Sequence, residues 1–283
     1  YQPSRVLIQR ILRRFGVSST MLSVEDHEGL ERVLQDTPTR LLAFESPTNP
    51  AVKIADLQRI TSIARRNDVL TVIDNTLAGV HNHGQFDVDV FVHSLTKYAA
   101  GHGDVLGGAI IASHELIEAM RADATLLGPA LDPHAAFLIL RGLKTYVVRW
   151  QAQCSNAQCV AEFLQSHPAV ERVSYPGLPG DPGHALAVEQ MDGFGAVVTF
   201  DLRAGTEAGS RFADALELFS ITASLGSTDS LVVAPAMQAP RGLTEQQRAW
   251  SAIGPGTVRL SIGLEDADDL IADLAQALQK AEA

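Results

Sequence analysis

Residues 69–76 read VLTVIDNT and residues 88–97 read VDVFVHSLTK, and these two stretches carry the clearest signal of the fold class. Each begins as a continuous apolar run and ends in polar side chains. A helical pattern over residues 57–66 precedes the first of them. Apolar runs separated by amphipathic helices are typical of a parallel sheet that is covered on both faces. We therefore predict an α/β protein.

The same patterns extend over the rest of the chain. In the first half, strands are predicted at 40–44, 69–73, 88–92 and 108–111, and helices at 5–15, 57–66 and, long or broken, 133–166. In the second half, strands are predicted at 195–202, 221–225, 231–233 and 258–262, and helices at 211–219, 245–253 and 267–281. The change of pattern predicts a large domain over residues 1–143, a smaller C-terminal α+β domain over residues 144–283, and a boundary at Leu143.

Composition excludes several classes of protein. Hydrophobic residues make up 46% and charged residues 19% of the chain, which is a globular balance. The net charge of -11 disfavours binding to nucleic acid or to anionic membranes. The sequence shows neither a secretory signal nor an apolar run long enough to span a membrane. Cys154 and Cys159 do not make a disulfide framework or a zinc site. A cytoplasmic enzyme without a metal is the default expectation.

Polar side chains gather where the predicted strands end. Asn49, Asp74, Ser94, Thr96 and Lys97 all follow apolar runs closely, and ligands of open α/β sheets bind at these strand ends. A desolvated lysine can form an imine with an aldehyde, hydroxyls can bind a phosphate, and a carboxylate can keep a pyridine nitrogen protonated. This combination fits pyridoxal phosphate (PLP). A surface lysine and a helix-capping aspartate remain the alternative at this point.

Longer motifs strengthen the PLP interpretation. They are 45-ESPTNP-50, 74-DNT-76, 94-SLTKYAAGHGDVLGG-108, 140-LRGLKT-145, 224-SLG-226, 230-SL-231 and 259-RLSIGLED-266. Their sequence and order along the chain resemble the Cys/Met-metabolism family of PLP enzymes, which includes cystathionine γ-synthase, cystathionine γ-lyase and methionine γ-lyase. The resemblance implies a fold-type-I PLP-dependent transferase fold, with a mainly parallel sheet in the large domain.

The resemblance also implies a role for each residue at the strand ends. Lys97 binds the cofactor covalently and moves the substrate's α-proton. Asp74 pairs with the protonated ring nitrogen, and the hydroxyls of Ser94 and Thr96 bind the phosphate. Asn49 contacts the cofactor ring oxygen and the substrate carboxylate.

Substrate contacts are implied further along the chain. Arg259 matches the arginine that grips the substrate α-carboxylate, for which a guanidinium fork is well shaped. A surface ion pair would be the ordinary alternative for a lone arginine. Ser224 matches a residue near the same carboxylate. The preceding Ala223 occupies a position where cystathionine enzymes tend to carry glutamate, and it favours an apolar γ-substituent.

The first residues depart from the family pattern. Tyr1 matches a tyrosine whose ring stacks on PLP and whose hydroxyl is a candidate proton donor to the leaving group. Pro3 stands where methionine γ-lyases carry cysteine. The family also has an N-terminal arm and a Gly-rich turn that reach the phosphate. The chain begins after them, so we expect the natural protein to carry a segment before Tyr1.

The resemblance implies PLP-dependent γ-elimination of a sulfur amino acid, giving a thiol, 2-oxobutanoate and ammonia. It also implies a homotetramer with active sites shared between subunits. Two alternatives remain. One is γ-replacement, as in a cystathionine γ-synthase or an O-acylhomoserine sulfhydrylase. The other is a non-catalytic scaffold that retains the fold. The histidines His81, His83 and His93 with Asp87 suggest a metal site only weakly, and we expect the His-x-His pair in the loop to be solvated.

Overall fold

A computed structural model of the chain describes residues 1–238 and 243–282. Its first sheet has the order β1 (Leu41–Glu45), β2 (Leu70–Asp74), β3 (Val90–Ser94) and β4 (Gly108–Ala112). Strands β1, β2 and β3 are parallel, as predicted, but β4 runs antiparallel to β3. The loop that joins β3 to β4 contains no crossover helix, so the chain reverses direction at the sheet edge.

Helices α2 (His27–Asp36) and α3 (Leu57–Arg66) pack against each other and against the first sheet. Their buried side chains, with those of the sheet, include Leu30, Leu34, Leu57, Ile60, Ile63 and Ile73. Each helix begins at an aspartate, Asp26 or Asp56, whose carboxylate accepts from a backbone N–H in the first turn. The sequence predicted α3 at its observed bounds but missed α2.

In the part of the chain that the structure describes, the first sheet is covered less completely than the apolar runs predicted. Leu41 is 53% exposed, Leu70 is 42% exposed, and Ile110 and Ile111 of β4 are 49% and 53% exposed. Helix α4 (His114–Leu127), which the sequence analysis also missed, follows β4 and has no buried residue. The apolar runs therefore identified the strands correctly without showing how far each strand is covered.

The first helical segment of the chain is continuous but irregular. An α-helix, α1 (Gln2–Val6), passes into a π-helix over Leu7–Ile11 and a 3-10 helix over Leu12–Phe15. Gly16, with a φ of 82°, ends it in the left-handed conformation, which glycine adopts without steric cost. None of the residues in these three pieces is buried.

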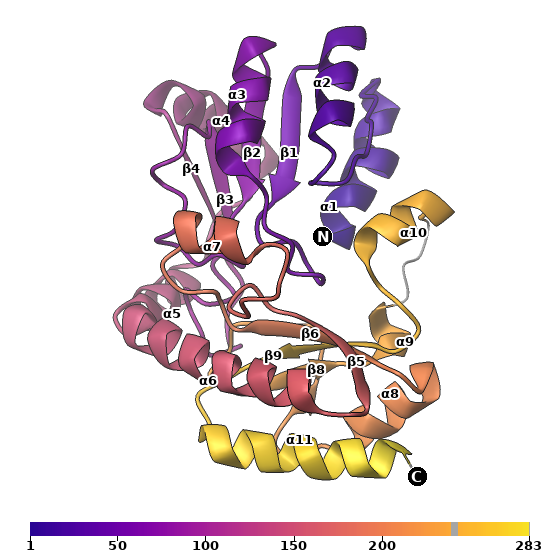
Figure 1. Cartoon of the computed structure of the whole chain (residues 1–283). Helices are drawn as coiled ribbons and strands as arrows, with labels where there is room; N and C mark the ends of the chain where they lie inside the picture. The colour runs from indigo at the N-terminus through magenta and orange to yellow at the C-terminus, as the bar shows by residue number, and fades with distance from the viewer. Residues whose placement is uncertain (239–242, 283) are drawn as a thin grey trace.

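The long helical pattern is broken, at Lys144 and Thr145, into α5 (Pro133–Leu143) and α6 (Tyr146–Ser166). Next comes a second sheet of order β5 (Val170–Ser174), β6 (Val197–Leu202), β9 (Thr257–Ser261), β8 (Leu231–Val233) and β7 (Ser220–Ile221). Its helices are α7 (His184–Gln190), α8 (Gly205–Ala215), α9 (Pro235–Gln238), α10 (Glu245–Ser251) and α11 (Ala267–Glu282). Figure 1 shows this sheet below the first one, with α11 lowest in the view.

Two predicted elements in this half are wrong in extent. The helix predicted over 211–219 is α8, which begins at Gly205 and ends at Ala215. Beyond it, the Asp273 carboxylate accepts from the backbone N–H groups of Glu217 and Leu218. These hydrogen bonds hold the two residues in a non-helical conformation. The strand predicted over 221–225 pairs with β8 only at Ser220 and Ile221.

The two halves of the chain share buried apolar side chains. Leu77 and Tyr98, from the first half, belong to the same core cluster as Trp150, Phe200 and Leu260. The ends of β2 and β3 therefore face the second sheet. The domain boundary at Leu143 falls at the end of α5 and stays a prediction. Among the described residues, no helix is both long and apolar enough to cross a membrane.

Candidate active site

The parallel strands bring Asp74 and Ser94 to one edge of the first sheet. Asp74 is the last residue of β2 and lies opposite Val92 of β3, whose last residue is Ser94. Lys97 follows in a tight turn, in which its backbone N–H donates to Ser94 at 3.2 Å and its carbonyl accepts from Gly101 at 2.8 Å. The local sequence thus fixes the lysine directly beyond the strand end.

A continuous path of hydrogen bonds joins four of the residues that were predicted as site residues. The Lys97 amine donates to the Ser224 hydroxyl at 2.9 Å. The Arg259 guanidinium donates to the Ser224 carbonyl at 2.7 Å and to Asn49 Oδ1 at 2.8 Å. The path gathers residues from β9 and from three separate loops. Arg259 is 6% exposed, so the alternative of a surface ion pair does not hold.

The segment that carries Ser224 approaches Lys97 closely because of a glycine. Gly226 has a φ of 73°, and a Cβ atom there would lie 2.7 Å from the backbone nitrogen of Tyr98. Any larger residue would therefore push the segment away from the lysine. The Ser261 hydroxyl accepts from Gly226 N–H at 2.9 Å and holds the segment against β9.

Burial changes the acid–base behaviour of the two cationic groups. Burial, together with the nearby charge of Arg259, lowers the pKa of the Lys97 amine from its usual value. Burial lowers the pKa of Arg259 to about 10, so this side chain remains charged at neutral pH. An amine whose pKa is lowered, beside a fixed cation, is the arrangement that an imine-forming lysine needs when it must also meet an anionic substrate.

This electrostatic coupling makes a testable prediction. Removing the positive charge in Arg259→Met should raise the pKa of Lys97. Because only the neutral amine attacks an aldehyde, the pH at which PLP uptake becomes fast should then be higher than in the unaltered protein. The measurement is the appearance of the visible band after PLP is added to PLP-free protein between about pH 6 and about pH 10. An unchanged pH profile in Arg259→Met would show that the two groups are not coupled.

The side chains of the remaining strand-end residues make hydrogen bonds of their own beside this path. Thr76 N–H donates to Asp74 Oδ1 at 3.1 Å, and Ser94 N–H donates to the Thr76 hydroxyl at 2.9 Å. The Thr96 hydroxyl accepts from Gly107 N–H at 3.0 Å and closes the loop after the lysine. Thr76, which belongs to the DNT motif, was not among the predicted site residues.

Tyr1 lies at the edge of the site. Its backbone nitrogen contacts one oxygen of the Glu45 carboxylate, and the other oxygen accepts from Asn49 N–H at 3.1 Å. The tyrosine is 59% exposed. Its contribution to catalysis stays a prediction. Glu45, at the end of β1, was missed as a residue that holds Asn49, although it is the first residue of the ESPTNP motif.

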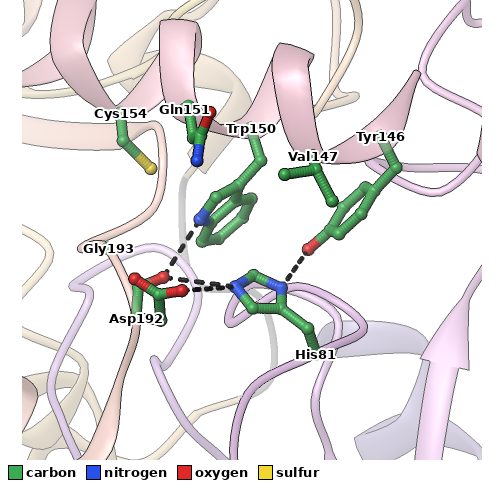
Figure 2. Close-up of a pocket in the computed structure, with 8 residues that line it drawn as sticks. All are labelled: His81, Tyr146, Val147, Trp150, Gln151, Cys154, Asp192 and Gly193. Atoms are coloured by element: carbon green, nitrogen blue, oxygen red, sulfur yellow. Dashed lines mark hydrogen bonds and ion pairs between the residues drawn. The ribbon is translucent and has the colours of Figure 1, made fainter.

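A separate cavity of about 310 Å³ lies beside α6. Figure 2 shows its lining, which is His81, Tyr146, Val147, Trp150, Gln151, Cys154, Asp192 and Gly193. None of the predicted site residues lines it. Trp150 packs edge-on against Tyr98, so these two rings stand between the cavity and the backbone that carries Lys97. Burial raises the pKa of Cys154 to about 12, which makes its thiol unreactive at neutral pH.

The donor set fits PLP. It offers an amine whose pKa is lowered, a carboxylate on the neighbouring strand, two hydroxyls, and a guanidinium whose buried Nε has no hydrogen-bond partner in residues 1–238 and 243–282. Lys97 would hold the aldehyde carbon, Asp74 the ring nitrogen, and Ser94 and Thr96 the phosphate. The sheet order and this site define a PLP-dependent enzyme of fold type I.

The comparisons with known proteins agree. A sequence model of the Cys/Met metabolism PLP-dependent enzyme family matches residues 1–279. The L-methionine gamma-lyase of Fusobacterium nucleatum subsp. polymorphum is 40% identical over 274 residues, which cover 95% of this chain and 69% of that protein. The L-methionine gamma-lyase of Pseudomonas putida is 42% identical over 270 residues, covering 94% and 67%.

A solved structure extends the agreement to the fold. The cystathionine gamma synthase from Xanthomonas oryzae pv. oryzae, in complex with cystathionine, superposes with a TM-score of 0.94 at 38% identity. The superposition covers 100% of this chain and 73% of that one. The chain therefore belongs to the Cys/Met metabolism PLP-dependent enzyme family, and PLP is its cofactor.

Proposed function

We propose that this protein eliminates the γ-substituent of a sulfur amino acid, with PLP as cofactor. The observation that carries the proposal is the hydrogen-bonded path Lys97–Ser224–Arg259–Asn49. In it, the amine that would move protons and the guanidinium that would bind a carboxylate both donate to Ser224. Methionine and one water would give methanethiol, 2-oxobutanoate and ammonia. The two L-methionine gamma-lyases described above support this choice of reaction.

Each residue of the site has a physical task in that reaction. Arg259 holds the substrate α-carboxylate and so orients the bond from the α-carbon to its proton. Bound PLP supplies an electron-withdrawing ring that stores the electron pair left at the α-carbon. Asp74 keeps the ring nitrogen protonated, because a carboxylate stabilises a neighbouring cation. Ser94 and Thr96 hold the phosphate.

Proton transfer is assigned to Lys97 and Tyr1. The Lys97 amine takes the α-proton and then takes part in removing a proton from the β-carbon. When the bond from the γ-carbon to sulfur breaks, sulfur receives a proton from the Tyr1 hydroxyl. Asn49, which accepts from Arg259 at 2.8 Å, keeps the guanidinium in place and lies where it can reach the carboxylate.

A substrate panel tests the proposed reaction. With PLP-loaded protein, we expect release of 2-oxobutanoate from methionine to be faster than from cystathionine, because the exposed Ala223 offers no carboxylate to a distal ammonium group. O-acetylhomoserine with a thiol should yield little thioether. The measurement is oxoacid release together with thioether formation for each substrate.

Two results would contradict elimination. Thioether formation from O-acetylhomoserine in excess of oxoacid release would show γ-replacement, which the 38% identity to a cystathionine gamma synthase keeps as the second candidate. Bound PLP without turnover of any substrate in the panel would show a non-catalytic scaffold.

We further propose that the protein acts as a homotetramer with shared active sites. Exposed apolar side chains on three consecutive helices support this assembly, namely Leu126, Leu127, Phe137, Leu140, Val147 and Val148. Light scattering that gives a single chain would overturn it. We also propose a cytoplasmic location, which the free thiols of Cys154 and Cys159 support and which cell fractionation would check.

A further inference from the structure

The loop between β2 and β3 contains a histidine that is entirely buried. His83 is 0% exposed, so the prediction that it is solvated is wrong. Its φ is 71°, in the left-handed region that histidine tolerates better than most residues. Burying an imidazole costs free energy unless a partner compensates for the lost water, so the contacts of His83 show what the burial achieves.

The partner of His83 is the side chain of Asn75. His83 Nδ1 lies 2.6 Å from Asn75 Oδ1. The Asn75 amide nitrogen donates to the carbonyls of Asn82 at 2.9 Å and Gly79 at 3.4 Å, which leaves its oxygen as the acceptor for His83. His83 therefore donates from Nδ1. Burial, with smaller effects of His93 and His81, lowers the pKa of His83 to about 4, so the ring is a neutral donor at neutral pH.

Asn75 is the residue through which this contact reaches the site. It lies between Asp74 and Thr76, is itself 0% exposed, and donates its backbone N–H to Val92 of β3 at 2.9 Å. Thr76 N–H donates to the Asp74 carboxylate at 3.1 Å. The orientation of the carboxylate is thus set by the same turn that His83 holds.

We propose that His83 is a positioning residue for Asp74. Its Nδ1–H fixes the Asn75 side chain, and the fixed turn directs the Asp74 carboxylate at the ring nitrogen of PLP. The proposal rests on the role proposed for Asp74. It needs no change of charge on His83, because the imidazole acts as a neutral donor throughout.

The experiment compares variants from both sides of the hydrogen bond. In His83→Ala and in Asn75→Ala, we expect kcat to fall about 10-fold to about 10²-fold, because a small misplacement of a reacting group has effects of this size. We expect KM to change by less than about threefold, because neither residue contacts the substrate carboxylate. PLP should dissociate about 10-fold more readily, measured by titrating PLP-free protein and following the visible band.

Rescue and coupling distinguish positioning from a general loss of structure. His83→Asn keeps an N–H near the position of Nδ1 and tolerates a positive φ, so it should recover most of the PLP affinity. The double variant His83→Ala with Asn75→Ala should be no worse than Asn75→Ala alone, because Asn75→Ala already removes the contact that His83→Ala removes.

Two control variants complete the experiment. His81→Ala alters the neighbouring loop histidine, whose Nδ1 lies 2.7 Å from the Tyr146 hydroxyl (Figure 2). Leu274→Ala opens a cavity in α11, where the side chain is 0% exposed, and should lower the melting temperature without changing PLP affinity. Both controls should keep kcat and the PLP dissociation constant of the unaltered protein.

The failure of each hypothesis has its own signature. If Asp74→Asn weakens PLP binding and kcat while the His83 and Asn75 variants behave like Leu274→Ala, then Asp74 has its role but His83 does not position it. If Asp74→Asn itself changes neither PLP binding nor kcat, then the role of Asp74 fails and the inference fails with it.

Discussion

Replacing Lys97 by alanine is expected to abolish turnover and to remove the visible absorption band that bound PLP gives to the protein. The amine is both the covalent attachment point and the group that moves the α-proton, so a loss of about 10³-fold or more is expected. The side chain is half-buried and its amine donates to the Ser224 hydroxyl, so the fold should survive the substitution. Absorbance and oxoacid release measure the two effects.

Lys144→Ala is the matched control for this prediction. Lys144 is exposed and lies at the C-terminal cap of α5. Its variant should keep the visible band and the rate of the unaltered protein. A yellow Lys97→Ala protein that turns over substrate within about tenfold of the normal rate would overturn the assignment of the catalytic amine.

Arg259→Lys is expected to lower kcat/KM strongly while PLP remains bound. A lysine retains the positive charge, but it cannot make all of the arginine's contacts at the same time. These are the bonds to Asn49 and to the Ser224 carbonyl, and the two parallel bonds to a carboxylate. Losing a buried charge-assisted contact costs about 3 kcal/mol, which corresponds to a decrease of about 10²-fold. Because the group binds substrate and not the cofactor, the visible band should be unchanged.

Arg172→Lys provides the comparison for the second prediction. Arg172 donates to Asp201 at 2.6 Å on the surface of the second sheet, where an ion pair contributes about 1 kcal/mol at most. Its variant should leave kcat/KM unchanged. If Arg259→Lys were as active as Arg172→Lys, the substrate carboxylate would have to bind elsewhere.

Local patterns in the sequence identified the strand ends correctly. Asp74 and Ser94 terminate β2 and β3 as predicted, because a continuous apolar run marks a buried strand and the first polar residues mark its exit from the sheet. Helix α3 followed from helical periodicity in the same way, whereas residues 133–166 were predicted as helical without deciding whether the helix is broken. The resemblance of the motifs then supplied Arg259 and Ser224, whose roles no local pattern reveals.

Local patterns failed to predict the direction of strand β4 and the burial of His83. Strand β4 has the composition of a parallel strand, yet it runs antiparallel because its direction depends on the loop before it. His83 looked like a solvated loop residue, yet it is buried because Asn75 offers it an acceptor beneath the turn. In both cases the outcome depends on residues outside the strand itself, namely the loop before β4 and the Asn75 side chain, and the apolar pattern of a strand carries no information about them.

Residue types and spacing along the chain pointed to the lysine, the carboxylate and PLP, because imine formation and ring protonation each require a particular functional group. The resemblance of the longer motifs to a PLP family then decided against a surface lysine and a capping aspartate. The fold had to bring Ser224 to 2.9 Å from the Lys97 amine and Arg259 to 2.8 Å from Asn49 across 127 and 210 positions of sequence. Contacts over such separations depend on how two sheets pack, and that packing is a property of the whole chain.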